Sequence, residues 1–464
     1  MTINELPDEI LLGIFGFCMA SPLPPPYYED AWHTLVHVCR RWRHVVFGSP
    51  RRLNLRLLCI NRRLTKTLDI WPEFPIVIHV DEKEVRSLPS VTDVISVLER
   101  NDRVCKIFID DVPNSSLEAI VATSKPFPAL IELELASFKK DTPTLRGSFL
   151  GGSVPSLRSL KFWGVPFPAL GKLLLSTREL VALSLGYIPS AGFISPEAMA
   201  AILSTLPRLQ SLHLGFETPR FWTHGPNRLP SALTRVTLPA LTTFEFAGNS
   251  KYLEDIASRI DAPLDYIAVT VTSYDQDRRE FDFPLLRDFI CRTKILNAAH
   301  RAETSFSNCY SRISLFQQKE GSDFKVLNLA IPCYTTDSLL VLAQACSSLL
   351  VPLPSLEHLS IYRSKYEISP LQWEDEVEKS QWIVLLRPFI AVKDLVLYEP
   401  VVLSVASALQ DLVGERVTEF LPSLQTIFLD GFPSSSPVPE GIAKFIAARE
   451  LCGRPVVVHL QGTE

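Results

Sequence analysis

Residues 128–135 read Pro-Ala-Leu-Ile-Glu-Leu-Glu-Leu, a phrase of the form P-x-L-x-x-L-x-L that recurs along the chain. Apolar residues alternate within its last part, so each copy predicts a short strand with one buried face. Further copies begin at Pro155, Pro207, Pro239, Pro354 and Pro422, and weaker ones near Arg178, Pro263 and Ala391. The leucine-type residue that opens L-x-L falls at positions 133, 160, 183, 212, 244 and 267, and again at 359, 395 and 427.

This spacing is typical of leucine-rich repeats of variable length that lack the asparagine of regular repeats. A strand, a turn and a helix cannot bury their own apolar face, so neighbouring units stack around one core. Apolar-periodic segments at 336–347 and 400–413 supply helices between the strands. A doubly wound α/β sheet also alternates strand and helix, but it predicts free spacing and continuous Val/Ile runs. We therefore predict the α/β class and a curved solenoid.

A proline-marked break at residues 71–75 suggests a domain boundary. Residues 1–70 would form a small all-helical module, in which the leucine-rich Arg51–Leu68 continues as helix. Residues 71–464 would form the solenoid. Its first elements are strands at 76–80 and 104–109 and helices at 91–100 and 115–123.

The phrase is interrupted between positions 267 and 359. A helix is predicted at 283–292, and alternating stretches at 301–307, 311–318 and 324–331 predict strands. We interpret these as a repeat strand, an inserted antiparallel strand and the next repeat strand, an insertion near 301–331. A helix near 440–451 and a strand at 455–460 end the repeats.

The N-terminal module contains two predicted amphipathic helices. Pro7 suits a first helical turn, acidic residues follow it, and Asp30 is a plausible cap for the second helix. A proline-rich insert near 20–28 connects the helices, and Gly48-Ser49-Pro50 ends the second. The two apolar stripes comprise Ile10, Leu11, Ile14, Phe15 and Cys18, and Leu35, Val38, Cys39, Trp42 and Val46.

This module resembles an F-box. The order Leu-Pro-x-Glu-x-x-x-x-Ile-Phe, then Val-Cys-Arg-x-Trp-Arg, then Ser-Pro carries the resemblance, although the connector is longer than usual. The segments at 381–390 and 412–424 extend it to fungal F-box proteins with degenerate leucine-rich repeats. The matching positions are Leu6, Pro7, Glu9, Ile14, Phe15, Val38, Cys39, Arg41 and Trp42.

The resemblance implies a substrate receptor of an SCF-type cullin-RING ubiquitin ligase. The helices would dock on a Skp-type adaptor, and through it on a cullin, while the repeats recruit a protein target. The alternative is a leucine-rich-repeat interaction scaffold without a ligase role. The implied adaptor-binding residues are Leu6, Pro7, Ile10, Leu11, Ile14, Phe15, Leu35, Val38, Cys39, Arg41 and Trp42.

Strand geometry predicts a second surface. The leucines of L-x-L point into the core, and the residues between them point onto the concave face of the sheet. Repeat proteins commonly bind partners there. Trp163, Phe221 and Trp222 are either binding anchors or core residues. The candidate target-binding residues are Glu132, Glu134, Lys161, His213, Glu245, His358, Tyr362, Tyr398 and Phe428.

Composition narrows the class of protein. The 464 residues are 47% hydrophobic and 21% charged, which suits a sizeable core. Net charge is −5, yet residues 31–68 hold nine Lys/Arg and no acid. This basic block lacks the interleaved aromatics of a nucleic-acid site, so we interpret it as a solvated face. Nine scattered cysteines, no signal peptide and no long apolar run indicate a reducing compartment, cytoplasmic or nuclear, and no membrane partner.

Motifs for covalent chemistry are not found in the sequence. The glycines at 147, 151 and 152 form no phosphate loop, and no G-x-S-x-G elbow occurs. His33 and His37 have the spacing of a metal pair, but no third ligand accompanies them. The acids at 374–378 are interpreted as a solvated charge run. We therefore expect no enzyme activity, no cofactor and no metal.

Overall fold

A computed structural model of the chain shows two compact units, one of residues 1–194 with 205–209 and one of residues 195–204 with 210–464. The structure describes residues 5–19, 32–59, 68, 71–81, 91–139, 141–217, 235–273, 283–293, 295–307, 310–332, 338–349, 353–363, 379–399, 401–412, 416–432 and 436–462. Phe221, Trp222 and Asp30, together with the proline-rich insert near 20–28 and the acids at 374–378, lie outside the described residues. The domain boundary near residue 70 stays a prediction.

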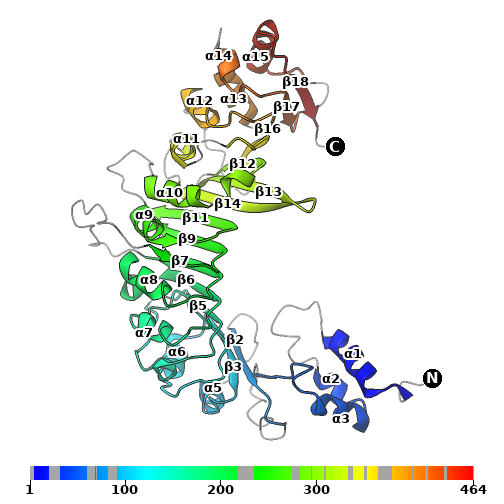
Figure 1. The fold of residues 1–464 in the computed structure, drawn as a ribbon, viewed down its shortest axis with the longest axis vertical. Helices are drawn as coiled ribbons and strands as arrows, with labels where there is room; N and C mark the ends of the chain where they lie inside the picture. The colour runs from blue at the N-terminus through cyan, green and yellow to red at the C-terminus, as the bar shows by residue number, and fades with distance from the viewer. Residues whose placement is uncertain are drawn as a thin grey trace. The chain divides into compact units, whose positions relative to one another are not determined.

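In the part that the structure describes, the first unit begins with the helices α1, α2 and α3 and continues with strands and helices (Figure 1). Its elements are α1 (Asp8–Met19), α2 (Trp32–Val36), α3 (Arg40–Gly48), β1 (Leu57–Cys59), β2 (Ile76–Asp81), α5 (Val91–Leu98), β3 (Val104–Asp110), α6 (Asn114–Val121), β4 (Glu132–Ala136), η3 (Phe149–Gly152), β5 (Ser159–Trp163), α7 (Leu170–Leu174), β6 (Ala182–Ile188) and η4 (Ser190–Gly192).

The strands of this unit pair in chain order from β1 to β6, and every pair is parallel. The repeated phrase sets the register, because Leu133 is the Cα partner of Leu160 and Leu160 that of Leu183. These leucines are buried. The predicted strands and helices between 76 and 123 are confirmed, as is the equivalence of the repeated leucines.

Two expectations for the N-terminal module are wrong. The helix predicted over residues 51–68 is wrong for the residues that the structure describes, because Leu57–Cys59 forms β1 and pairs with β2; residues 60–67 lie outside the described part. All three residues of β1 are buried, as in a strand with both faces covered. The second helix is also not continuous: α2 ends at Val36 and α3 begins at Arg40.

The second unit is longer and continues the strand–helix alternation. Its elements are α8 (Pro196–Leu203), β7 (Ser211–Phe216), β8 (Val236–Thr237), β9 (Thr243–Asn249), α9 (Ser250–Arg259), β10 (Ile260–Asp261), β11 (Tyr266–Ser273), α10 (Pro284–Arg292), η5 (Leu296–Ala298), β12 (Arg301–Phe306), β13 (Tyr310–Lys319), β14 (Ser322–Pro332), α11 (Ser338–Leu349), β15 (His358–Arg363), α12 (Lys379–Leu386), β16 (Asp394–Tyr398), α13 (Val401–Gln410), α14 (Arg416–Glu419), β17 (Thr426–Asp430), α15 (Glu440–Leu451) and β18 (Val457–Gln461).

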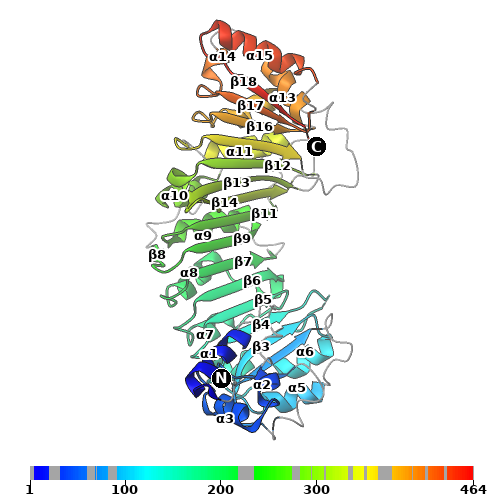
Figure 2. The ribbon, with the colours of Figure 1, turned by 90° about the vertical axis from the view of Figure 1, so that its right-hand side faces the viewer.

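Its sheet runs in the order β7-β9-β11-β14-β13-β12-β15-β16-β17-β18 (Figure 2). Leu212, Phe244 and Ile267 share one register position, and Leu359, Leu395 and Ile427 share another, as the repeated phrase predicts. β13 is antiparallel to both of its neighbours, and the remaining ladders are parallel.

The segment expected as an insertion is a three-stranded meander whose order is reversed. β14, the last of its strands, pairs with β11, whereas β12, the first, pairs with β15. The chain therefore passes over two strand positions through α10, returns through the meander, and passes over two positions again through α11. Parallel pairs need such crossover connections, and a helix supplies each one.

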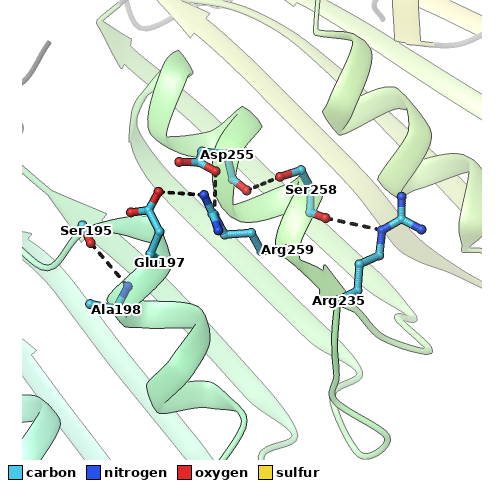
Figure 3. A network of polar contacts seen from close by, with 7 residues as sticks. All are labelled: Ser195, Glu197, Ala198, Arg235, Asp255, Ser258 and Arg259. Carbon is cyan, nitrogen blue, oxygen red and sulfur yellow. Dashed lines mark hydrogen bonds and ion pairs between the residues drawn. The ribbon is translucent and has the colours of Figure 1, made fainter. Parts of the chain in front are cut away.

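The helices of the second unit pack side by side in chain order, α8 to α13 and then α15, and lie on one side of the sheet (Figure 1). Polar contacts tie neighbouring helices (Figure 3). Arg259 of α9 pairs with Glu197 of α8 and with Asp255 on its own helix, both at 2.6 Å. Arg259 thus links two successive repeats.

The next helix is held in a similar way. The Glu254 carboxylate of α9 accepts hydrogen bonds from the backbone N–H groups of Leu285 and Leu286, at 2.9 and 2.8 Å. Helix N-termini leave such N–H groups without internal partners, and an acidic side chain there also suits the helix dipole. Arg292 of α10 donates back to carbonyl oxygens of Ala257 and Ile260.

One glycine of the first unit is required by packing. Gly164 follows β5 with φ of +67°, and a Cβ there would lie 1.9 Å from the Ser137 carbonyl oxygen. Gly152 has a similar φ of +70°, but its nearest neighbour would lie at 3.4 Å. Substituting alanine at both positions therefore separates the cost of the backbone conformation from the cost of steric overlap.

We predict that Gly164→Ala destabilises the first unit much more than Gly152→Ala. Both variants incur the left-handed backbone cost of about 1–2 kcal/mol. Gly164→Ala adds an overlap that forces the backbone apart, which costs roughly 1–3 kcal/mol or more. Urea unfolding followed by circular dichroism measures both. Equal losses in the two variants would show that the approach of Gly164 to Ser137 is unimportant.

Candidate functional site

Helix α1 is apolar on two faces, of which one is covered. Leu11 and Phe15 are fully buried, and the Phe15 ring lies 4.7 Å from that of Trp42 on α3. Ile10, Ile14 and Phe17 remain 51%, 37% and 86% exposed. A helix that is apolar on both sides but covered on one presents a surface for another molecule.

The break between α2 and α3 exposes a further apolar side chain. Cys39 has an extended backbone, and its Sγ accepts a hydrogen bond from the Trp42 N–H at 3.4 Å, which caps α3. The preceding turn leaves Val38 59% exposed. We call Ile10, Ile14, Phe17 and Val38 the apolar patch.

Arg41 has an internal partner. Its Nη2 lies 2.7 Å from Asp8 Oδ1 and also donates to the Leu6 carbonyl oxygen. It therefore fixes the start of α1 against α3. The Pro7 carbonyl accepts hydrogen bonds from the N–H groups of Ile10 and Leu11, so Pro7 stands immediately before the helix.

The predicted adaptor residues thus divide by exposure. Pro7, Ile10, Ile14 and Val38 are exposed; Leu6, Cys39, Arg41 and Trp42 are half-buried; Leu11, Phe15 and Leu35 are buried. The buried members support the patch and do not form it. Sequence reasoning missed Phe17, although Ile10, Ile14 and Phe17 follow at offsets 0, 4 and 7 on one helical face.

An aromatic cluster joins the helices to the segment that leads into β2. Trp32 of α2 contacts Trp71 and Phe74 at ring distances of 5.3 and 5.6 Å, and His33 stacks on Trp71 at 5.2 Å. Phe47 of α3 also contacts Trp71 and Phe74. These five residues form what we call the junction. It lies in the proline-marked segment, so that segment packs against the helices.

Hydrogen bonds fix the junction on both sides. Trp32 Nε1 donates to the Arg56 carbonyl oxygen at 2.8 Å. Arg103, just before β3, donates from Nε and Nη2 to the Phe74 carbonyl oxygen at 3.2 and 3.0 Å. Burial, and to a smaller extent the neighbouring His37, lowers the pKa of His33. The lowered pKa favours the neutral form of the imidazole.

The open sheet face of the first unit carries matched charges. Lys106 pairs with Glu132 at 3.2 Å, and Lys161 pairs with Glu134 at 2.6 Å. Trp163 is half-buried and lies beside Tyr187, 5.4 Å between rings, so it is accessible from this face. Three predicted target-binding residues, Glu132, Glu134 and Lys161, thus meet cross-strand partners.

The open face of the second unit holds the remaining candidates in two groups. His213 and Glu245 are cross-strand partners 3.1 Å apart, and this hydrogen bond is the main cause that lowers the pKa of Glu245. The second group lies on β15 to β17. There His358 pairs with Asp394 at 2.9 Å, and the Tyr362 and Tyr398 rings are 5.9 Å apart. Phe428 stacks on His459 of β18.

The described part of the chain contains an open pocket and no arrangement of side chains that could hold a metal ion. Within it, no group of three His, Cys, Asp or Glu is arranged to hold a metal ion. His33 and His37 both contact Trp71. An open pocket of about 460 Å³ lies at the ends of β4 to β6, and its lining includes Ser137, Phe138 and Tyr187. No described helix combines the length and apolarity that a bilayer crossing needs.

Comparison with known proteins gives little beyond this geometry. No protein-family model and no curated protein sequence matches the chain. Among solved structures it is similar to the leucine-rich repeat-containing protein LegL7 from Legionella pneumophila. The identity is 13%, the TM-score is 0.28, and the match covers 86% of this chain and 98% of that one. The register of the strands, in which Leu133 is opposite Leu160 and Leu359 opposite Leu395, supports the repeat class independently of this distant likeness.

We predict that the junction weakens as pH falls. A histidine whose pKa is lowered on folding stabilises the folded state above its unfolded value, about 6.5, and this contribution is lost as pH falls through the folded value. Thermal unfolding of the full chain between about pH 7.5 and 5 should show a falling midpoint. His33→Phe, which keeps a ring but cannot titrate, should flatten that dependence.

The exposed His44 of α3 provides a matched control. His44→Phe should leave the pH dependence as in the unmodified chain. An identical fall of the midpoint in the unmodified chain and in His33→Phe would contradict the assignment to His33.

Proposed function

We propose that this protein is a substrate receptor of an SCF-type cullin-RING ubiquitin ligase. In this proposal the apolar patch docks on a Skp-type adaptor, which links it to a cullin, and the repeats recruit a protein target. The protein would act in the cytoplasm or nucleus and carry out no covalent chemistry itself. Holding target and ligase together raises their effective concentration.

One observation carries the proposal: four apolar side chains lie exposed on α1 and the α2–α3 turn. Exposed apolar groups of this kind indicate a protein partner. The sequence pattern that resembles an F-box falls on the same helices and the residues just before α1, and its buried member Phe15 packs against Trp42 of α3.

The charge of the module suits a protein partner. Arg40, Arg43 and His44 are exposed on α3. Exposed basic groups favour association with an acidic protein surface by raising its rate. Trp42 is half-buried against Phe15, and Phe47 contacts Trp71 and Phe74, so the two largest rings of α3 pack within the protein and do not form a stacking surface for nucleic acid bases.

The repeats account for the second half of the proposal. A parallel strand–helix array presents its open face as a continuous series of side chains, a common arrangement for protein recognition. A repeat interaction scaffold without a ligase role shares this face. The two candidates differ only in what the apolar patch binds.

Co-purification of the full chain with a Skp-type adaptor tests the proposal. We predict that the unmodified chain retains the adaptor and that Ile10→Asp with Phe17→Asp loses it by more than about tenfold, since each buried side chain contributes roughly 1.5–3 kcal/mol. Leu451→Asp is the matched control, because Leu451 is a 90% exposed leucine of α15.

Failure of the unmodified chain to retain the adaptor would favour the scaffold without a ligase role. Equal retention by the double variant would mean that the adaptor binds elsewhere. Circular dichroism of each variant verifies that the helices are intact.

A further inference from the structure

The open sheet faces repeat one arrangement of three groups: an aromatic ring, a cation above it, and a carboxylate that pairs with the cation. Lys161 lies 5.7 Å from the Trp163 ring centre and 2.6 Å from Glu134. Lys106 lies 5.9 Å from the Phe108 ring centre and 3.2 Å from Glu132. Ring and carboxylate attract the cation together.

The second unit contains a third example. The Arg301 guanidinium lies 4.4 Å from the Phe316 ring centre, and its Nε is 3.0 Å from Asp323. In these three places the chain supplies all three groups itself.

The last strands contain the ring and the carboxylate without the cation. Tyr362, Tyr398, Phe428 and His459 form a platform across β15 to β18, with none of the four rings fully buried. Asp430 is the cross-strand partner of Tyr398. Burial, followed by the carboxylates of Asp430 and Glu303, raises the pKa of Tyr398.

Two neighbouring carboxylates already have partners. Glu303 is paired with Arg301 at 2.8 Å, and Asp394 is paired with His358. Among the residues that the structure describes, no lysine or arginine pairs with the Asp430 carboxylate. Residues 69–464 as a whole hold 46 acids and 37 bases, so the repeats are acidic.

We propose that the platform and Asp430 bind an arginine or lysine side chain of an extended segment in a partner protein. The partner's cation would lie over the rings of Tyr398 and Phe428 and pair with Asp430. The proposal deepens and rests on the function proposed above, since the partner is the recruited target. A nucleic acid could stack on the rings, but Asp430 would repel its phosphates.

The test uses the full chain and a phage-displayed library of random dodecapeptides. Selected peptides should be enriched in arginine and lysine. Their affinity should fall by about tenfold in Asp430→Asn and in Tyr398→Ala, as expected when a hydrogen bond to a charged group or a ring contact is lost. Asp411→Asn is the matched control, because it makes the same change at a carboxylate outside the sheet that already has Lys379 as a partner at 3.0 Å.

Selected peptides without basic residues, or no selected peptides, would overturn the proposal. So would an effect of Asp430→Asn no larger than that of Asp411→Asn. Retention of the Skp-type adaptor by the same variants separates the two proposals. It should be unchanged by Asp430→Asn, and its absence in the unmodified chain would contradict the ligase role without affecting the peptide result.

Discussion

The parallel hydrogen-bond ladder between successive copies of the repeated phrase is the constraint on which the structure depends. Each copy buries its leucines only if the next copy stands beside it in register. Leu133 opposite Leu160, and Leu359 opposite Leu395, satisfy this condition. Because the register is set by the leucines, the residues between them must face away from the core, which aligns the open-face side chains in rows.

The contacts outside the ladder reinforce the same stacking. Arginines at the helix ends reach carbonyl oxygens or carboxylates of the preceding repeat, as Arg259 does with Glu197 and Arg292 with Ile260. The buried Arg449 of α15 likewise donates to carbonyl oxygens of Val417, Phe420, Leu421 and Leu424. A repeat array is stabilised by its nearest-neighbour interfaces, and these bonds span those interfaces.

The N-terminal helices are held by side-chain packing and not by the strand ladder. They contribute little to the ladder, yet the junction of Trp32, His33, Phe47, Trp71 and Phe74 packs them on the segment before β2. Their exposed apolar side chains are therefore presented from a fixed base. A binding surface on a firmly packed element loses less conformational entropy when its partner arrives.

Much of the strand pattern could be predicted from the sequence, because alternation and the repeated leucines encode both a strand and its register. The order of the strands β12, β13 and β14 in the sheet could not be predicted from the sequence. Alternation at 301–331 shows which side chains are buried, but not which neighbour a strand chooses, and β14 rather than β12 pairs with β11. The strand β1 was mistaken for helix, because Leu57, Leu58 and Cys59 form a short continuous apolar run, which does not distinguish a buried strand from a helix.

For the candidate site, sequence spacing identified Ile10, Ile14 and Val38 of the apolar patch, but it did not show which apolar residues of these helices are exposed. The stripe read from α1 mixed buried Leu11 and Phe15 with exposed Ile10 and Ile14, since periodicity does not say which of two apolar faces is covered. Val38 became exposed through a break in the helix that Cys39 caps. Pairings on the open face, such as Asp430 beside Tyr398, required the strand neighbours to be known.

We propose that the N-terminal helices and the repeats bind different partners through separate surfaces. Hydrogen–deuterium exchange of the full chain, with and without a saturating Skp-type adaptor, distinguishes the two surfaces. We expect slower exchange in peptides that cover residues 5–19 and 32–48, and unchanged exchange across residues 379–462. Protection confined to the repeats, or unchanged exchange in α1 while the adaptor is bound, would contradict it.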